Sequence, residues 1–161
     1  MPHTPTTTAL RGFLLSFKGN PFTCPPEKAL WVEEDGLLIM QNGKITHCGP
    51  YTQTHQFLPA NCPVTHYPNS LISAGFIDTH VHYPQLSVIA SWGDELLAWL
   101  QHYVFPAESR FVDKTFASAT AKAFLTELLR NGTTTAPVYC TVHPHSVDAF
   151  FEESARLGTR M

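Results

Sequence analysis

The residues with the clearest capacity for chemistry are His80 and His82, because imidazole nitrogens are common ligands of zinc. Phe76, Ile77 and Val81 give the surrounding stretch the character of a β-strand. Successive side chains of a strand point to opposite faces, so we expect both imidazoles on one face, at the strand's C-terminal end. A catalytic zinc usually takes three protein ligands and keeps a position open for water. The spacing therefore predicts part of a metal site.

Two surface histidines at a strand end are the alternative interpretation of this pair. The chain has nine histidines, and His143 and His145 form a second pair with the same spacing. His143 follows a predicted strand, on the rim where barrel active sites form. However, Pro144 between the two histidines is unfavourable in a paired strand. We therefore do not predict that the second pair binds the metal.

Composition describes an ordinary soluble protein of one domain, or one domain with a small companion. The chain has 161 residues, of which 43% are hydrophobic and 14% charged, and its net charge is −3. It contains no run of lysine or arginine, so we expect no nucleic-acid partner and no membrane partner. Its four cysteines are widely spaced, which favours reduced thiols over a disulfide framework. No apolar run suits a signal peptide or a membrane span, so we expect a cytoplasmic protein.

Residues 1–70 are predicted to form a β-rich, sandwich-type module without a catalytic constellation. Asn42-Gly43 between two apolar stretches is a strong signal for a two-residue hairpin turn. A short strand over 64–67 is expected to end in a turn at Pro68-Asn69-Ser70. The other predicted strands cover 9–18, 36–41 and 44–48.

Residues 71–161 are predicted to alternate between strands and helices, which is typical of parallel strands joined by crossover helices. Strands are expected at 75–85 and 133–140, with a third beginning at 159–161. Helices are expected at 95–103, interrupted at Phe105-Pro106-Ala107-Glu108, then at 113–130, and at 147–157 with Ser146 as its cap. A (β/α)8 TIM barrel needs roughly 250 residues. We therefore expect the first two β/α units of an incomplete barrel.

The stretch from Gly75 to His82 resembles the amidohydrolase superfamily, whose first barrel strand carries Gly-Phe-Ile-Asp-x-His-x-His. That superfamily usually has proline where this chain has Ala74, a departure that affects strand entry and not metal binding. Further stretches resemble the guanine deaminase family within the superfamily. They are His82-Tyr83-Pro84-Gln85, the run from Leu96 to Leu100 followed by the run from Tyr103 to Glu108, Arg130-Asn131-Gly132-Thr133-Thr134-Thr135-Ala136, and the run from Val142 to Asp148.

The resemblance implies a metal-dependent hydrolase whose metal is zinc. Such an enzyme converts guanine and water to xanthine and ammonia in purine catabolism. His80 and His82 match the first two ligands of the one zinc ion, and His82 and Gln85 match substrate-binding positions. The Gln85 amide has a donor and an acceptor, which suits a lactam, although an ordinary loop residue is the alternative. Trp92, Trp99 and Phe105 could shape a flat pocket, but aromatic residues near helical spacing are more often core, so they are assigned to the core. The resemblance also implies a homodimer for the full-length enzyme.

The family's other zinc ligands and its proton-shuttling glutamate are expected beyond residue 161, so no catalytic acid or base is identified within this chain. We expect this fragment to be inactive alone. Two alternatives remain open. One is a related amidohydrolase that acts on another aminopurine, a pyrimidine or a triazine, and the other is a non-enzymatic remnant of such a gene.

Overall fold

A computed structural model describes residues 6–161, and the first five residues of the predicted N-terminal module lie outside the described residues. The chain divides into two compact units, Met1–Ala74 and Gly75–Met161. No helix within residues 6–161 has both the length and the apolar character needed to cross a membrane. Each unit is described by itself below.

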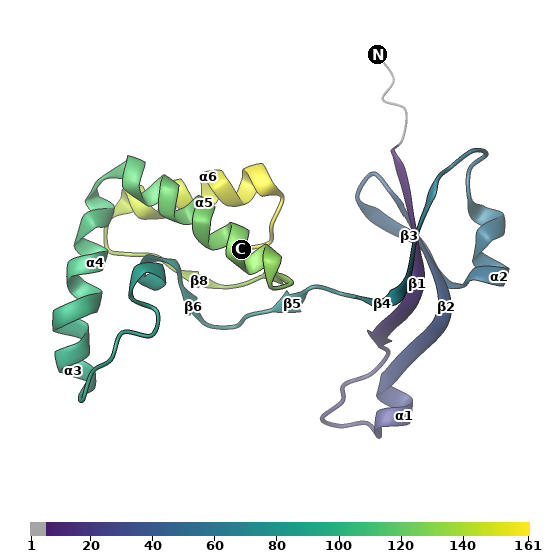
Figure 1. Cartoon of the computed structure of the whole chain (residues 1–161), viewed down its shortest axis with the longest axis horizontal. Coiled ribbons are helices and arrows are strands. Elements are labelled where there is room, and N and C mark those ends of the chain that lie inside the picture. Colours follow the sequence, from purple (N-terminus) through teal and green to yellow (C-terminus); the bar gives the residue numbers. More distant parts are fainter. Residues whose placement is uncertain (1–5) are drawn as a thin grey trace, which may run out of the picture. The chain divides into compact units, whose positions relative to one another are not determined.

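The first unit is a mixed four-stranded sheet in the order β3-β2-β1-β4 (Figure 1). Strand β1 (Thr7–Phe17) pairs antiparallel with β2 (Leu30–Gln41) and parallel with β4 (Val64–Ser73), while β3 (Lys44–Pro50) pairs with the outer edge of β2. Ala9, Leu37 and Ile39 are its buried centre. The connections contain the short helices α1 (Pro26–Ala29) and α2 (Tyr51–Thr54) and the 3₁₀ helix η1 (His55–Phe57).

In this sheet, one sequence-based prediction about a turn is confirmed and one is wrong. The predicted hairpin is confirmed, because Asn42 and Gly43 both have positive φ, at 51° and 76°. The predicted end of the last strand at Tyr67 is wrong, since β4 continues to Ser73. Gly12 pairs with Tyr67 and the next residue, Phe13, pairs with Leu71, so the sheet absorbs the intervening residues as a bulge.

The second unit begins with two short pairs of parallel strands. Strand β5 (Phe76–Ile77) pairs with β7 (Thr133–Thr135), and β6 (Val81–His82) pairs with β8 (Val138–Tyr139). A single parallel bridge joins Thr135 to Arg160, where the third strand was expected to begin. The predicted alternation of parallel strands and helices is therefore confirmed. Within residues 6–161 these strands form no closed barrel.

The first crossover is more helical than predicted. Helix α3 (Leu96–Trp99) continues through a π-helical turn, η3 (Leu100–Val104), into α4 (Phe105–Ser109), and a 3₁₀ turn, η4 (Arg110–Val112), follows. The predicted interruption at Phe105-Pro106-Ala107-Glu108 is wrong because Pro106 lies in the first turn of α4. The wide turn before it accommodates the proline, because there the Phe105 N–H donates to the Leu100 carbonyl, five residues back instead of four.

Two long helices complete the unit, α5 (Lys114–Arg130) and α6 (Pro144–Leu157), and they pack side by side (Figure 1). Asp113 caps α5 by accepting the Thr115 N–H at 2.8 Å, and Gly158 ends α6 with φ of 69°. Ser146 was predicted to cap α6, which is wrong because the helix begins at Pro144. Ser146 lies inside the first turn, where its hydroxyl donates to the His143 carbonyl.

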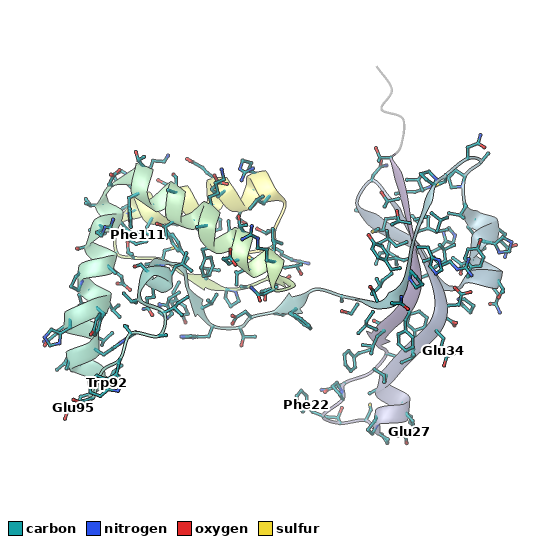
Figure 2. The ribbon with its side chains drawn as sticks, viewed as in Figure 1. Phe22, Glu27, Glu34, Trp92, Glu95 and Phe111 are labelled. Atoms are coloured by element: carbon teal, nitrogen blue, oxygen red, sulfur yellow. The ribbon has the colours of Figure 1, made fainter. Side chains whose placement is uncertain are left out.

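Tyr83 is the centre of the core of this unit. It begins the 3₁₀ helix η2 (Tyr83–Val88), is fully buried, and packs against the rings of Phe111, Phe124 and Phe150. Figure 2 labels Phe111 within this helical unit. The Tyr83 hydroxyl donates to the Ser146 carbonyl at 2.7 Å. Burial raises the pKa of the Tyr83 phenol, so the hydroxyl stays a proton donor at physiological pH.

We predict that Tyr83→Phe lowers the free energy of unfolding by about 1–3 kcal/mol, because it leaves the buried Ser146 carbonyl without its donor. Denaturant titration followed by far-UV circular dichroism measures the change. Tyr103→Phe is the matched control, since Tyr103 is exposed and should change the free energy by less than about 0.5 kcal/mol. Equal stabilities of the two variants would contradict the role given to the Tyr83 hydroxyl.

Candidate metal centre

A break between β5 and β6 shapes the candidate metal centre. The continuous strand predicted over 75–85 is wrong, because the chain leaves the strand at Asp78, and Thr79 and His80 form a bend. Asp78 Oδ1 accepts the His80 N–H at 3.0 Å, while the Asp78 N–H donates to the Thr135 carbonyl at 3.0 Å. The Asp78 carboxylate therefore accepts the His80 N–H, which in a regular strand would donate to the neighbouring strand.

The imidazoles of His80 and His82 nevertheless lie against each other. Their Nε2 atoms are 3.3 Å apart, and their ring centroids are 5.1 Å apart. Strand alternation predicted such proximity, but His80 lies in the bend and only His82 belongs to β6. The bend at Thr79 and His80, together with β6, thus brings the two nitrogens together.

The separation of the two nitrogens fits a tetrahedral metal. Two nitrogens that are each about 2.0–2.1 Å from one tetrahedral zinc ion are about 3.3–3.4 Å apart. The separation of the His80 and His82 Nε2 atoms is 3.3 Å. Each imidazole would then carry its proton on Nδ1 and offer the Nε2 lone pair to the ion. The pair can therefore supply two zinc ligands without a change in its spacing.

Tyr139 packs against both imidazoles from the neighbouring strand. Its ring stacks on His82, with centroids 4.6 Å apart and an interplanar angle of 13°, and lies 4.7 Å from His80. In the parallel register of β6 and β8, His82 is paired with Tyr139. The sequence analysis did not include Tyr139. The predicted parallel pairing could have found it, had the register been known.

The histidine pair opens onto a cavity of about 300 Å³ that Gln85 also lines. The structure therefore brings together the three residues that the sequence analysis placed at the site. Leu86, Ile89 and Trp99 contribute apolar walls, so Trp99, which the sequence analysis assigned to the core, lines the cavity. The Trp99 indole N–H donates to the Ser91 hydroxyl at 2.8 Å, which orients the ring at the cavity wall.

Gln85 also contacts a carboxylate. Its Nε2 donates to Glu108 Oε1 at 3.4 Å, a long hydrogen bond between two half-buried side chains. Gln85 belongs to η2 and Glu108 to α4, so the contact joins the segment that follows the histidines to the first crossover. Glu108 lay in a stretch whose resemblance to the family was noted, but its contact with Gln85 depends on tertiary structure.

The second histidine pair is not part of this cavity. His143 precedes α6 and lines a different cavity with Glu108, whereas His145 lies in the first turn of that helix. Within residues 6–161, His, Cys, Asp and Glu side chains form no group of three or more that could hold a metal ion. Of the predicted ligands, the described part of the chain brings His80 and His82 together as a pair.

Comparisons with known proteins found relatives that match most of this chain. Guanine deaminase of Escherichia coli (strain K12) is 44% identical over 133 residues, which are 83% of this chain and 30% of that protein. A "Probable guanine deaminase" of Deinococcus radiodurans is 38% identical over 155 residues, covering 94% of this chain and 35% of that protein. The crystal structure of guanine deaminase from Bradyrhizobium japonicum superposes with a TM-score of 0.90 at 34% identity, covering 96% of this chain and 34% of that chain.

The chain therefore spans about a third of the length of these relatives. The model of the Amidohydrolase family matches residues 71–161, which include both β/α units and the site residues. The predicted fold class, a β-rich module followed by the start of an amidohydrolase TIM barrel, is confirmed by these neighbours. On the evidence of that match, which extends over more than half of its length, the chain belongs to the amidohydrolase family.

Proposed function

We propose that this chain carries two zinc ligands and a purine-binding side chain of a guanine deaminase, which hydrolyses guanine to xanthine and ammonia. The observation that carries the proposal is the convergence of His80, His82 and Gln85 on one cavity, with the two Nε2 atoms at the spacing of tetrahedral ligands. The other ligands and a proton-shuttling carboxylate would come from residues other than these.

His80 and His82 bind the metal in this proposal, and their neighbours keep the two rings in place. Zinc lowers the pKa of a bound water toward ~7, which makes hydroxide available at neutral pH. Stacking of Tyr139 on His82 and the hydrogen bond from the His80 N–H to Asp78 restrict the positions of both imidazoles. The Nε2 atoms are therefore oriented before the ion binds, which reduces the entropic cost of binding.

Gln85 and the apolar walls of the cavity bind the substrate. Leu86 and Trp99 offer a dry surface for a planar heterocycle, and the Gln85 amide can hydrogen-bond the edge of a lactam. His82 borders the same cavity and would contact the substrate as well as the metal. The chain thereby orients the ring relative to the metal-binding nitrogens.

The choice of guanine is supported by the relatives named above, which are 44% and 38% identical and carry that activity in their names. This similarity favours guanine over the other aminopurines, the pyrimidines and the triazines that the sequence analysis left open. It also favours an enzyme over a non-enzymatic remnant.

We predict that His80→Ala and His82→Ala each lower the zinc affinity of the chain by at least about tenfold, since changes in residues that merely support a ligand already cost ~10–100-fold. Competition with a chromogenic chelator measures the affinity. The control is His102→Ala, because His102 is an exposed histidine on η3 and should leave zinc binding unchanged. If all four proteins bound zinc equally, the assignment of the pair as ligands would be wrong.

A hybrid enzyme tests the substrate. We expect E. coli guanine deaminase to form xanthine from guanine when its 133 matched residues are replaced by those of this chain. In the hybrid, Gln85→Ala should lower kcat/KM about 5- to 150-fold, because a hydrogen bond to a substrate amide contributes about 1–3 kcal/mol.

Zinc content, measured by atomic absorption, should be the same in the hybrid with and without Gln85→Ala. A hybrid that is folded and contains zinc but forms no xanthine would contradict the proposed function. An unchanged kcat/KM in Gln85→Ala would contradict the substrate-binding role alone.

A further inference from the structure

Glu108 stands out among the acidic residues of the second unit because its carboxylate contacts an amide at the candidate site. Within residues 6–161 it forms no salt bridge, and its side chain has one hydrogen-bond partner, Gln85. The nearby cation Arg110 instead lies over the ring of Phe116, 4.0 Å from its centroid. Glu108 is also half-buried, although the next two residues of the chain, Ser109 and Arg110, are exposed.

The chemistry of this pair determines which way the Gln85 amide is turned. A carboxylate can only accept hydrogen bonds, whereas an amide has an NH₂ donor at one end and a carbonyl acceptor at the other. If the amide were rotated by half a turn, its carbonyl oxygen would face a carboxylate oxygen, and two acceptors would repel each other. The 3.4 Å contact from Gln85 Nε2 to Glu108 Oε1 is the orientation in which the pair attracts.

We propose that Glu108 is a positioning residue, which keeps the Gln85 amide turned so that its carbonyl oxygen is the acceptor offered to a ligand in the cavity. Because Gln85 lines the cavity with His80 and His82, this acceptor would select heterocycles that present an N–H group at that edge. The inference deepens the proposed function and rests on it for the identity of the ligand. Guanine, with ring N–H and amino donors, belongs to this class.

The orientation itself can be measured in the 161-residue chain without any substrate. With ¹⁵N-labelled glutamine, the Gln85 NH₂ signals are identified by their absence in Gln85→Ala. We expect one of the two NH₂ protons to be shifted downfield by the carboxylate in the unaltered chain. Glu108→Gln, which keeps the size of the side chain, should remove that shift because an amide partner permits both orientations of Gln85. The same signals in both proteins would overturn the proposal.

The consequence for specificity is measured in the hybrid enzyme. Glu108→Gln should lower kcat/KM for guanine about twofold or more, because the Gln85 amide then adopts both orientations and only one of them binds guanine. Glu108→Lys places a donor against the amide and reverses its preference, so kcat/KM should fall into the ~5- to 150-fold range expected for Gln85→Ala. Glu95→Lys, on the exposed residue before α3 that Figure 2 labels, is the control and should not change kcat/KM.

A double-mutant cycle separates positioning from a purely structural role. In the Gln85→Ala background, Glu108→Lys should cause no further loss, because Glu108 acts through the amide alone. An equal loss with and without Gln85 would overturn the proposal. If Glu108→Lys does not fold, the nuclear magnetic resonance comparison of the unaltered chain with Glu108→Gln still tests whether Glu108 orients the Gln85 amide. A hybrid without guanine turnover but with the predicted amide signals would refute the proposed function and leave the positioning role standing.

Discussion

The buried hydrogen bond from Tyr83 to the Ser146 carbonyl is the interaction on which the second unit depends. Tyr83 follows His82 directly and precedes Gln85 by two residues, so the side chains of the candidate site are attached on either side of it. Its ring packs on aromatic residues of η4, α5 and α6. The position of the histidine pair is therefore fixed by the core of the unit, although His80 itself is exposed.

The two histidines are positioned in two different ways. His82 belongs to β6, which is paired with β8, whereas His80 lies in a bend and its N–H donates to the Asp78 carboxylate. Stacking by Tyr139 then joins the two imidazoles from the neighbouring strand. A regular strand would place the imidazoles on one face, but it would not by itself bring their Nε2 atoms to 3.3 Å. The interruption of the strand is thus part of how the site is built.

Much of the fold was predictable because its signals are local. The Asn42-Gly43 turn, the Asp113 cap and the Gly158 stop each require only a few neighbouring residues. The contacts of Tyr139 with the histidines, and of Glu108 with Gln85, join residues that are distant in the sequence. They depend on strand register and helix orientation, which local patterns do not determine.

The π-helical turn at Leu100–Val104 shows why the orientation of α4 could not be predicted. One extra residue in a turn rotates the helix that follows by about 100° relative to the helix before it. Val104 at the end of the turn, with Ala107 and Phe111 after it, forms a buried stripe, while Leu96 and Leu97 before the turn are 72% and 62% exposed. A single helical period therefore cannot describe both segments. Glu108 follows Ala107 at the margin of the buried stripe, and the rotation directs this margin toward η2, where Gln85 lies.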